Sequence, residues 1–176
     1  MADHKLHTAV YRALKAAHID SIHADPACSM NREEHVQLFL DKNGGRENHF
    51  CNVDILILNK NKDVSAIIEI EESDITPIKI FGKFLASALS SFYIQKSGKN
   101  KHAIGTGAVL FLQVIDSSGL PRPTKRIKLW ENIEKKIKEI NISKMKYKML
   151  IGNPTDFENG KEKYNSLVAL LNGHLS

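Results

Sequence analysis

Residues 53–71 read VDILILNKNKDVSAIIEIE and specify the centre of the predicted fold. Two apolar runs flank the polar tip Lys60-Asn61-Lys62-Asp63. Apolar runs of this length, separated by polar turn residues, are typical of two β-strands joined as a hairpin. We therefore predict one strand over residues 50–58 and a second over residues 64–71.

Three acidic residues interrupt these apolar runs: Asp54 in the first, and Glu69 and Glu71 in the second. A carboxylate buried in such a run costs several kcal/mol, or its pKa rises, unless something compensates its charge. The three acids therefore require a structural or chemical explanation.

The register of the hairpin offers one. If the loop is the four residues 60–63, Asn59 pairs with Val64 and Asp54 lies opposite Glu69, with Cβ atoms about 5 Å apart. Glu71 then lies on the same face, roughly 6 to 7 Å further along the strand. This register puts Val53, Ile55 and Ile57 on one face with Ala66, Ile68 and Ile70, whereas a loop one residue longer or shorter scatters the acids over both faces.

Opposed carboxylates repel each other, so this cluster predicts a bound cation. Carboxylate oxygens without cysteine ligands suit Mg²⁺ or Mn²⁺, and such a metal can activate water and shield a phosphate during in-line attack. The alternative is a site without metal, in which the two glutamates reach solvent at the strand end and Asp54 pairs with a lysine.

The remaining patterns predict a mixed α/β fold whose central β-sheet is flanked by helices. Thr76-Pro77 is typical of a helix start, and the apolar run 107–115 of a central strand. His4, His7 and His18 fall on an N-terminal helix on which we expect them to be exposed, and we assign them no ligand role. The further predicted helices cover residues 3–18, 31–40, 77–94, 124–140 and 161–171, with another strand over 146–151.

Length and composition favour a single domain over residues 1–176. The sequence shows no membrane-spanning run and no secretory signal, so we expect a cytoplasmic protein. Two cysteines are too few for a disulfide framework or a zinc site.

Positive charge is concentrated in residues 122–148, which hold ten Lys and Arg residues and three acids, a net charge of +7. The whole chain has a formal net charge of +5. Such a block favours a polyanion through counterion release, although a solvated helix face would show the same composition. Trp130 and Tyr147 lie in this segment and are candidates for stacking on bases.

An acid in one strand, a polar turn and then Glu69-Ile70-Glu71 at the end of a second apolar strand resemble the PD-(D/E)xK nuclease superfamily. The order of elements from residue 31 to residue 115 is similar to the αβββαβ core of restriction endonucleases, with residues 121–176 as a basic helix-strand-helix extension. Val53 stands where the family usually has proline. Glu71 stands at the usual lysine, as in a subset of type II restriction endonucleases.

The resemblance implies roles for these residues. Asp54 and Glu69 would bind the metal together with the main-chain carbonyl of Ile70, and Glu71 would position or deprotonate the attacking water. Some relatives add a glutamate from the first core helix, which points to Glu34 or, as the weaker candidate, Glu33. Alternatively the motif lysine has moved to the next helix, where Lys79 and Lys83 share a face.

The resulting hypothesis is a Mg²⁺-dependent endodeoxyribonuclease of the type II restriction endonuclease kind that acts on double-stranded DNA as a homodimer. Candidate DNA contacts are Lys79, Lys83, Lys125, Arg126 and Lys128. The alternatives are a repair or mobile-element nuclease, a non-catalytic DNA-binding protein on the same fold, and an interaction module whose acids bind a basic partner.

Overall fold

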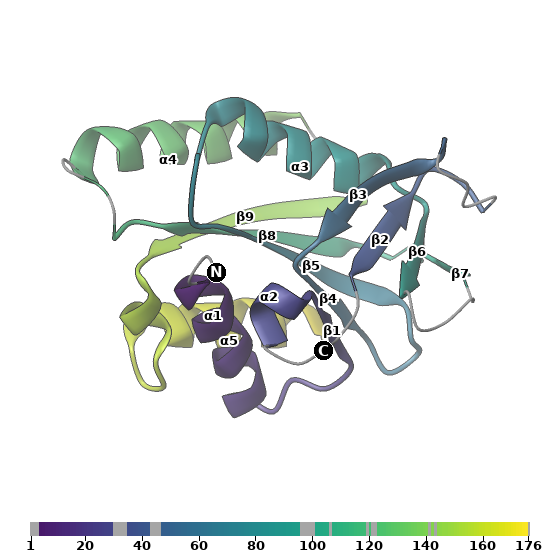
Figure 1. The fold of residues 1–176 in the computed structure, drawn as a ribbon, viewed down its shortest axis with the longest axis horizontal. Helices are drawn as coiled ribbons and strands as arrows, with labels where there is room; N and C mark the ends of the chain where they lie inside the picture. Colours follow the sequence, from purple (N-terminus) through teal and green to yellow (C-terminus); the bar gives the residue numbers. More distant parts are fainter. Residues whose placement is uncertain are drawn as a thin grey trace.

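A five-stranded mixed β-sheet with helices on both faces forms the centre of the computed structural model (Figure 1), which confirms the predicted α/β class. The structure describes residues 4–29, 35–42, 47–95, 101–105, 107–118, 120, 123–140, 142 and 144–175. The strand order is β1-β4-β5-β8-β9, with β4 antiparallel to β5, and β8 parallel to both β5 and β9. These strands are β1 (Ile22–Ala24), β4 (Ile55–Leu58), β5 (Val64–Glu71), β8 (Val109–Asp116) and β9 (Met145–Gly152).

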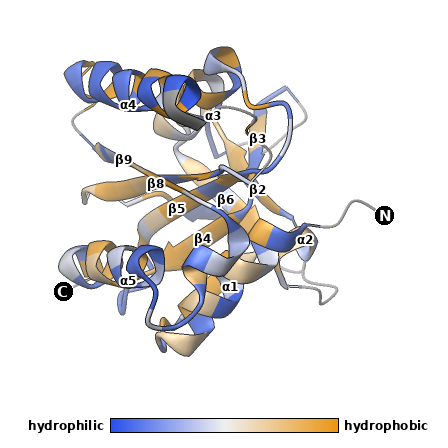
Figure 2. Ribbon diagram, turned by 90° about the vertical axis from the view of Figure 1, so that its left-hand side faces the viewer, coloured by the Kyte–Doolittle hydropathy of each residue, from blue (hydrophilic) through white to orange (hydrophobic). Residues whose placement is uncertain are grey.

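Two layers of helices enclose this sheet. Figure 1 shows α1 (Lys5–Ala16), α2 (Pro26–Ser29) and α5 (Glu162–Leu175) on one face, and α3 (Pro77–Leu89) and α4 (Pro123–Glu139) on the other. A 3₁₀ turn, η1 (Pro154–Phe157), packs against α1. The strands between the layers are largely hydrophobic, whereas α4 is mostly hydrophilic (Figure 2). Among the described residues, no helix is long and apolar enough to cross a membrane.

The predicted hairpin register is confirmed over three pairs: Ile55 with Ile68, Leu56 with Ile67, and Ile57 with Ala66. The predicted pair of Asn59 with Val64 is wrong, because the register shifts by one residue and Leu58 takes that place. This irregularity lies at the turn end of the hairpin and leaves the register near Glu69 unchanged.

The predicted strand over residues 50–58 is two strands, β3 (His49–Val53) and β4, separated by a bend at Asp54. The bend turns β3 out of the central sheet. Val53 therefore packs in the hydrophobic cluster under α3 and α4, and its predicted place beside Ile55 and Ile57 is wrong.

A second, antiparallel sheet accounts for two further corrections. Its order is β3-β2-β6-β7, with β2 (Val36–Phe39), β6 (Phe92–Gln95) and β7 (Lys101–Ala103). The helix predicted over 31–40 is wrong where residues are described, because Val36–Phe39 pairs with both β3 and β6. The helix predicted to continue to residue 94 ends at Leu89, after which Ser90 adopts extended backbone and β6 begins.

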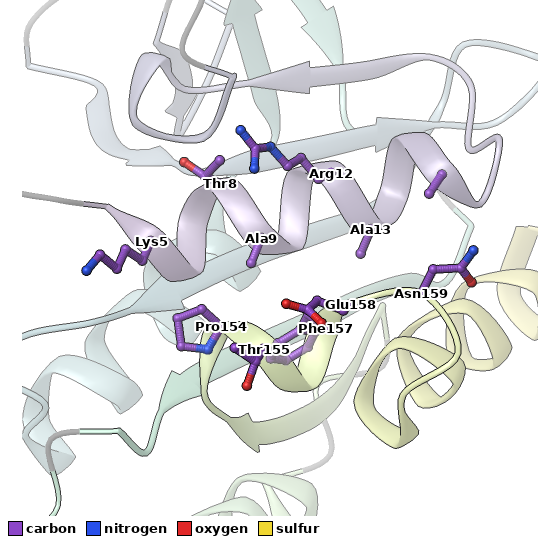
Figure 3. Close-up of a pocket in the computed structure, with 11 residues that line it drawn as sticks. Lys5, Thr8, Ala9, Arg12, Ala13, Pro154, Thr155, Phe157, Glu158 and Asn159 are labelled. Carbon is purple, nitrogen blue, oxygen red and sulfur yellow. The ribbon is translucent and has the colours of Figure 1, made fainter.

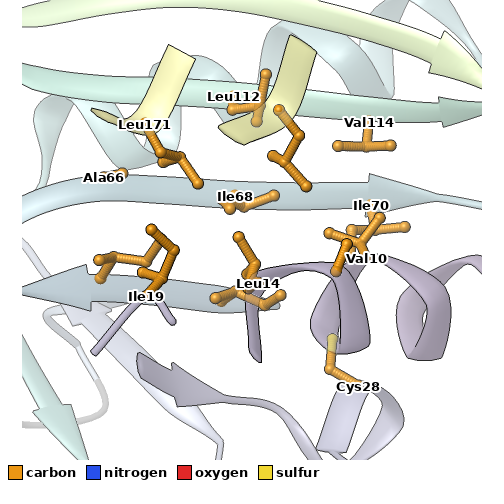
Figure 4. Packing of buried hydrophobic residues seen from close by; sticks show 14 of the residues in the cluster. Val10, Leu14, Ile19, Cys28, Ala66, Ile68, Ile70, Leu112, Val114 and Leu171 are labelled. Atoms are coloured by element: carbon orange, nitrogen blue, oxygen red, sulfur yellow. The ribbon is translucent and has the colours of Figure 1, made fainter. Parts of the chain in front are cut away.

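The hydrophobic core on the α1 side supports the central strands. Ile68 and Ile70 of β5 and Leu112 and Val114 of β8 pack with Val10, Leu14 and Leu171 from the helices (Figure 4). Each such side chain contributes roughly 1.5 to 3 kcal/mol when fully buried. This packing fixes the end of β5, where the acidic residues lie.

Candidate metal centre

Asp54 lies at the bend where the chain leaves the central sheet. Its Oδ2 accepts a hydrogen bond of 2.7 Å from the backbone N–H of Ile70. Its carbonyl oxygen accepts a bond of 2.8 Å from the N–H of Asp25. The side chain thus takes the place of a strand partner for β5, because the β4 ladder ends at the pair of Ile55 with Ile68.

Glu69 and Glu71 lie on the α3 side of β5, and the side chain of each is 1% exposed. Both carboxylates approach the ammonium group of Lys83: its Nζ is 2.7 Å from Oε2 of Glu69 and 3.0 Å from Oε1 of Glu71. The same Nζ is 3.8 Å from Oδ2 of Asp54. The structure therefore brings together the three acids that the register predicted to share a face.

Two lysines from α3 balance much of this negative charge. Lys79 Nζ lies 2.9 Å from Oε2 of Glu71 and donates a hydrogen bond to the Ser73 carbonyl. Burial lowers the pKa of Lys83, but the charges of Glu69, Asp54 and Glu71 outweigh it and raise the pKa above its usual value. Lys83 therefore stays protonated at neutral pH.

Glu69 carries the least compensated carboxylate. Burial, followed by the negative charge of Asp54, raises its pKa well above the usual value in spite of Lys83. Its Oε1 is buried and has no hydrogen-bond partner among the residues that the structure describes. A buried acceptor without a partner costs about 1 to 3 kcal/mol, so this oxygen is suited to bind a cation.

Glu71 also contacts a buried polar pair, Gln113 and Tyr147, to which the sequence analysis assigned no such role. Gln113 on β8 is fully buried, and its Nε2 lies 3.4 Å from Oε1 of Glu71. Its Oε1 accepts a hydrogen bond of 2.7 Å from the Tyr147 hydroxyl. The signal in the sequence is that Gln113 is the one polar residue in the apolar run 109–115.

Asp54 also faces the α1 side, through His7. His7 Nε2 lies 3.6 Å from Oδ1 of Asp54, and His7 Nδ1 lies 2.9 Å from Oε2 of Glu72. The prediction that His7 is exposed is wrong, because its relative exposure is 7%. His4 and His18 are exposed as predicted.

These contacts set the protonation of Asp54 and His7. Burial raises the pKa of Asp54, but the His7 hydrogen bond and the charge of Lys83 together hold it below its usual value. Burial lowers the pKa of His7, and the contacts with Asp54 and Glu72 reverse that effect and raise it. Asp54 is therefore a carboxylate held between a histidine and a lysine.

The residues predicted to contact DNA differ in how exposed they are. Lys125, Arg126 and Lys128 are exposed on α4. Trp130 and Tyr147 are 1% and 4% exposed, so their predicted stacking on bases is wrong. Glu33 and Glu34 lie outside the described residues.

A groove of about 530 Å³ lies away from the acids, between α1 and the turn at η1 (Figure 3). Its lining includes Thr8 and Arg12 from α1 and Thr155 and Glu158 from the other wall. Asp54, Glu69 and Glu71 are absent from this lining. The groove therefore adds nothing to the chemistry of the acidic cluster.

Comparisons of the chain with protein-family models, with curated proteins and with solved structures found no match.

Proposed function

We propose that this chain is a Mg²⁺-dependent endodeoxyribonuclease that hydrolyses phosphodiester bonds of double-stranded DNA. The observation that carries the proposal is the convergence of Asp54, Glu69 and Glu71 on one point at the end of a buried strand, where Glu69 Oε1 has no hydrogen-bond partner in the described part of the chain. Mn²⁺ is the alternative ion, since both metals prefer oxygen ligands.

The order of elements supports a restriction-endonuclease-like core. In the central sheet α1 is followed by β1, β4 and β5, which are antiparallel neighbours, and then by α3 and the parallel strand β8. The chain inserts α2, β2 and β3 between β1 and β4, and β6 and β7 between α3 and β8. This order resembles the αβββαβ core of that nuclease family, with α1 in place of the helix predicted at residue 31.

The proposed ligands are Asp54, Glu69 and the main-chain carbonyl of Ile70. The N–H and C=O of one strand residue point to the same side, and the Ile70 N–H points to Asp54. The Ile70 carbonyl therefore faces the side that β4 has left. A metal bound there would lower the pKa of a coordinated water and shield the charge of the phosphate.

The other side chains position water and phosphate. Glu71, held by Gln113, is placed to accept the proton of the attacking water. Lys83 now lies between the carboxylates, so a bound cation requires its ammonium group to move aside. Its flexible four-carbon stem permits that movement, and the freed charge can then stabilise a phosphate.

The proposed homodimer would use an apolar stripe on α3. Ile78, Leu85 and Leu89 are 84%, 38% and 59% exposed, and their spacing places them on one side of the helix. Exposed apolar patches often mark association surfaces. Ile78→Glu combined with Leu89→Glu should convert a dimer to a monomer in light scattering; a wild-type monomer would contradict this surface.

A second candidate is a DNA-binding protein without catalysis. The observation that favours it is that Lys83 already contacts all three acids, so a closed ion-pair cluster could hold the site together without metal. Restriction, repair and mobile-element roles would share the same chemistry under the first proposal.

The test is cleavage of supercoiled plasmid with Mg²⁺ or Mn²⁺, stopped by EDTA. Asp54→Asn removes a ligand, and Asp20→Asn makes the same change at an exposed acid outside the site. The nuclease proposal predicts that the metal-dependent cleavage is lost in the first variant and kept in the second. DNA binding without cleavage in the wild type would favour the second candidate, and loss of neither activity in Asp54→Asn would contradict the assigned site.

A further inference from the structure

A second group of ligating atoms lies on the α1 side of Asp54. His4 and His7 come from the first turn of α1 and its cap, and Glu72 follows the end of β5. His7 Nδ1 and His4 Nδ1 lie 2.9 Å and 3.3 Å from the same atom, Oε2 of Glu72. One ligand atom from each residue falls within 4.8 Å of the other two.

These separations fit one small dication. Zinc binds histidine nitrogen and carboxylate oxygen at about 2.0 to 2.2 Å, so two ligands on a tetrahedral zinc are roughly 3.3 to 3.5 Å apart. The His4 contact matches this separation, and the His7 contact needs a shift of only a few tenths of an ångström. Three protein ligands also leave a coordination position open, and the 45% exposure of the His4 side chain opens the group to solvent.

Neighbouring groups lie where the outer partners of metal ligands are usually found. His7 Nδ1 faces Glu72 while Nε2 faces Oδ1 of Asp54 at 3.6 Å. Histidine ligands usually donate their second N–H to a carboxylate, and Asp54 lies on that side of the His7 ring, just beyond hydrogen-bond distance. The other oxygen of Glu72, Oε1, accepts a hydrogen bond from the backbone N–H of Leu6.

Glu72 has a structural role as well, because a carboxylate at the start of a helix satisfies a free N–H and favours the helix dipole. That role accounts for the Leu6 contact and needs no histidine. His4 is not used in capping, since its side chain makes no cap hydrogen bond. Replacing His4 therefore distinguishes a metal site from a helix cap, because only the metal site needs this residue.

We propose that His4, His7 and Glu72 form a site for a transition-metal dication, with Zn²⁺ preferred over Mg²⁺. Imidazole nitrogen suits zinc and its neighbours, whereas Mg²⁺ prefers oxygen. This inference is independent of the proposed nuclease function. The two sites meet at Asp54, which faces Lys83 with one oxygen and His7 with the other.

The test uses the full chain, stripped with EDTA and titrated with Co²⁺, whose visible absorption reports nitrogen ligands and a low coordination number. We expect one equivalent to bind, Zn²⁺ to displace it and excess Mg²⁺ to leave it in place. His4→Ala should weaken Co²⁺ binding at least tenfold. His102→Ala, at an exposed histidine on β7, is the matched control and should bind as wild type.

Several results would overturn the site: no Co²⁺ spectrum, equal affinity in His4→Ala, or displacement by Mg²⁺ as readily as by Zn²⁺. Circular dichroism of His4→Ala checks that the helix persists, as expected for an exposed residue without a capping bond. Glu72→Gln changes a second proposed ligand and should also weaken Co²⁺ binding. Asp54→Asn should still bind one equivalent of Co²⁺, about tenfold more weakly because His7 faces Asp54, while it loses DNA cleavage. Failure of this site and failure of the nuclease proposal are therefore distinguishable.

Discussion

The two sides of Asp54 differ in the chemical groups that surround its carboxylate. On the α3 side, Glu69 and Glu71 are buried carboxylates, and two lysines supply positive charge. On the α1 side, two histidines and Glu72 offer mixed nitrogen and oxygen ligands, and one histidine is open to solvent. A hard cation would bind in the first arrangement only after Lys83 moves, whereas a softer one would need only a small shift of His7 in the second.

Replacement of Asp54 should have the largest effect, because this residue belongs to both sides. Asparagine replaces one of the two oxygens by an NH₂ donor, so it cannot present an oxygen both to His7 and to the Ile70 N–H as Oδ1 and Oδ2 of Asp54 do. We expect Asp54→Asn to reduce plasmid cleavage more than about 100-fold, since loss of an outer partner alone costs about 10- to 100-fold. Co²⁺ titration of the same variant should show binding weakened about tenfold, within that range. A change in cleavage alone, or in Co²⁺ binding alone, would contradict the proposal that Asp54 serves both sides.

Lys83→Met should affect metal binding on the α3 side of Asp54 and not on the α1 side. It removes the ammonium group that competes for Glu69 and Glu71, so Mg²⁺ affinity measured by calorimetry should rise while cleavage falls. Unfolding by urea should become easier by about 1 to 3 kcal/mol, less than for a fully buried pair because Lys83 is partly exposed. Co²⁺ binding should change little.

The matched control for that variant is Lys79→Met, which removes a lysine that contacts Glu71 alone among the three acids. It should shift each quantity in the same direction by a smaller amount. Unchanged Mg²⁺ affinity in Lys83→Met would contradict the competition between its ammonium group and the metal for Glu69 and Glu71.

Gln113→Leu should act on the α3 side through positioning. The substitution leaves the Tyr147 hydroxyl and one Glu71 oxygen without their buried partner, which costs about 1 to 3 kcal/mol of unfolding free energy. Urea denaturation measures this loss, and kcat of cleavage should fall while Mg²⁺ affinity stays near wild type. A loss of stability with unchanged kcat would show that Gln113 does not position Glu71.

The smallest effect on the site should come from the exposed basic face of α4. Replacing Lys125, Arg126 and Lys128 with alanine should weaken DNA binding for all sequences alike, and both sides of Asp54 should stay intact. The slope of log K against log salt should fall by about 2 to 3, because each phosphate contact contributes about 0.9. An unchanged slope in a salt-dependent binding assay would remove α4 from the DNA-binding surface.

The sequence predicted the α3 side well because the acids of that side lie close together in the sequence. The acids stand in alternating positions of one hairpin, and the apolar residues between them fix the register. The same reasoning placed Lys79 and Lys83 on one helical face, and the structure brings both to Glu71. The exchange of Asn59 for Leu58 at the turn did not disturb these positions.

The α1 side could not be predicted in that way, because its partners are distant in sequence. His7 and Glu72 are 65 residues apart, and the helix pattern alone put His7 on an exposed surface. The spacing of His4 and His7 by three residues was the available signal, since such residues are neighbours on a helix. The acids and the asparagine that precede Val36 and Leu38 favour a helix, whereas pairing with β3 and β6 makes this segment a strand.

The most direct test of the acidic cluster is a crystal structure with Mn²⁺, located by its anomalous scattering. We expect a peak in contact with Asp54 and Glu69 Oε1, with the Lys83 ammonium group moved away from its position between the carboxylates. Saturating Mn²⁺ with no peak at these oxygens, and with Lys83 still bound to all three acids, would contradict it.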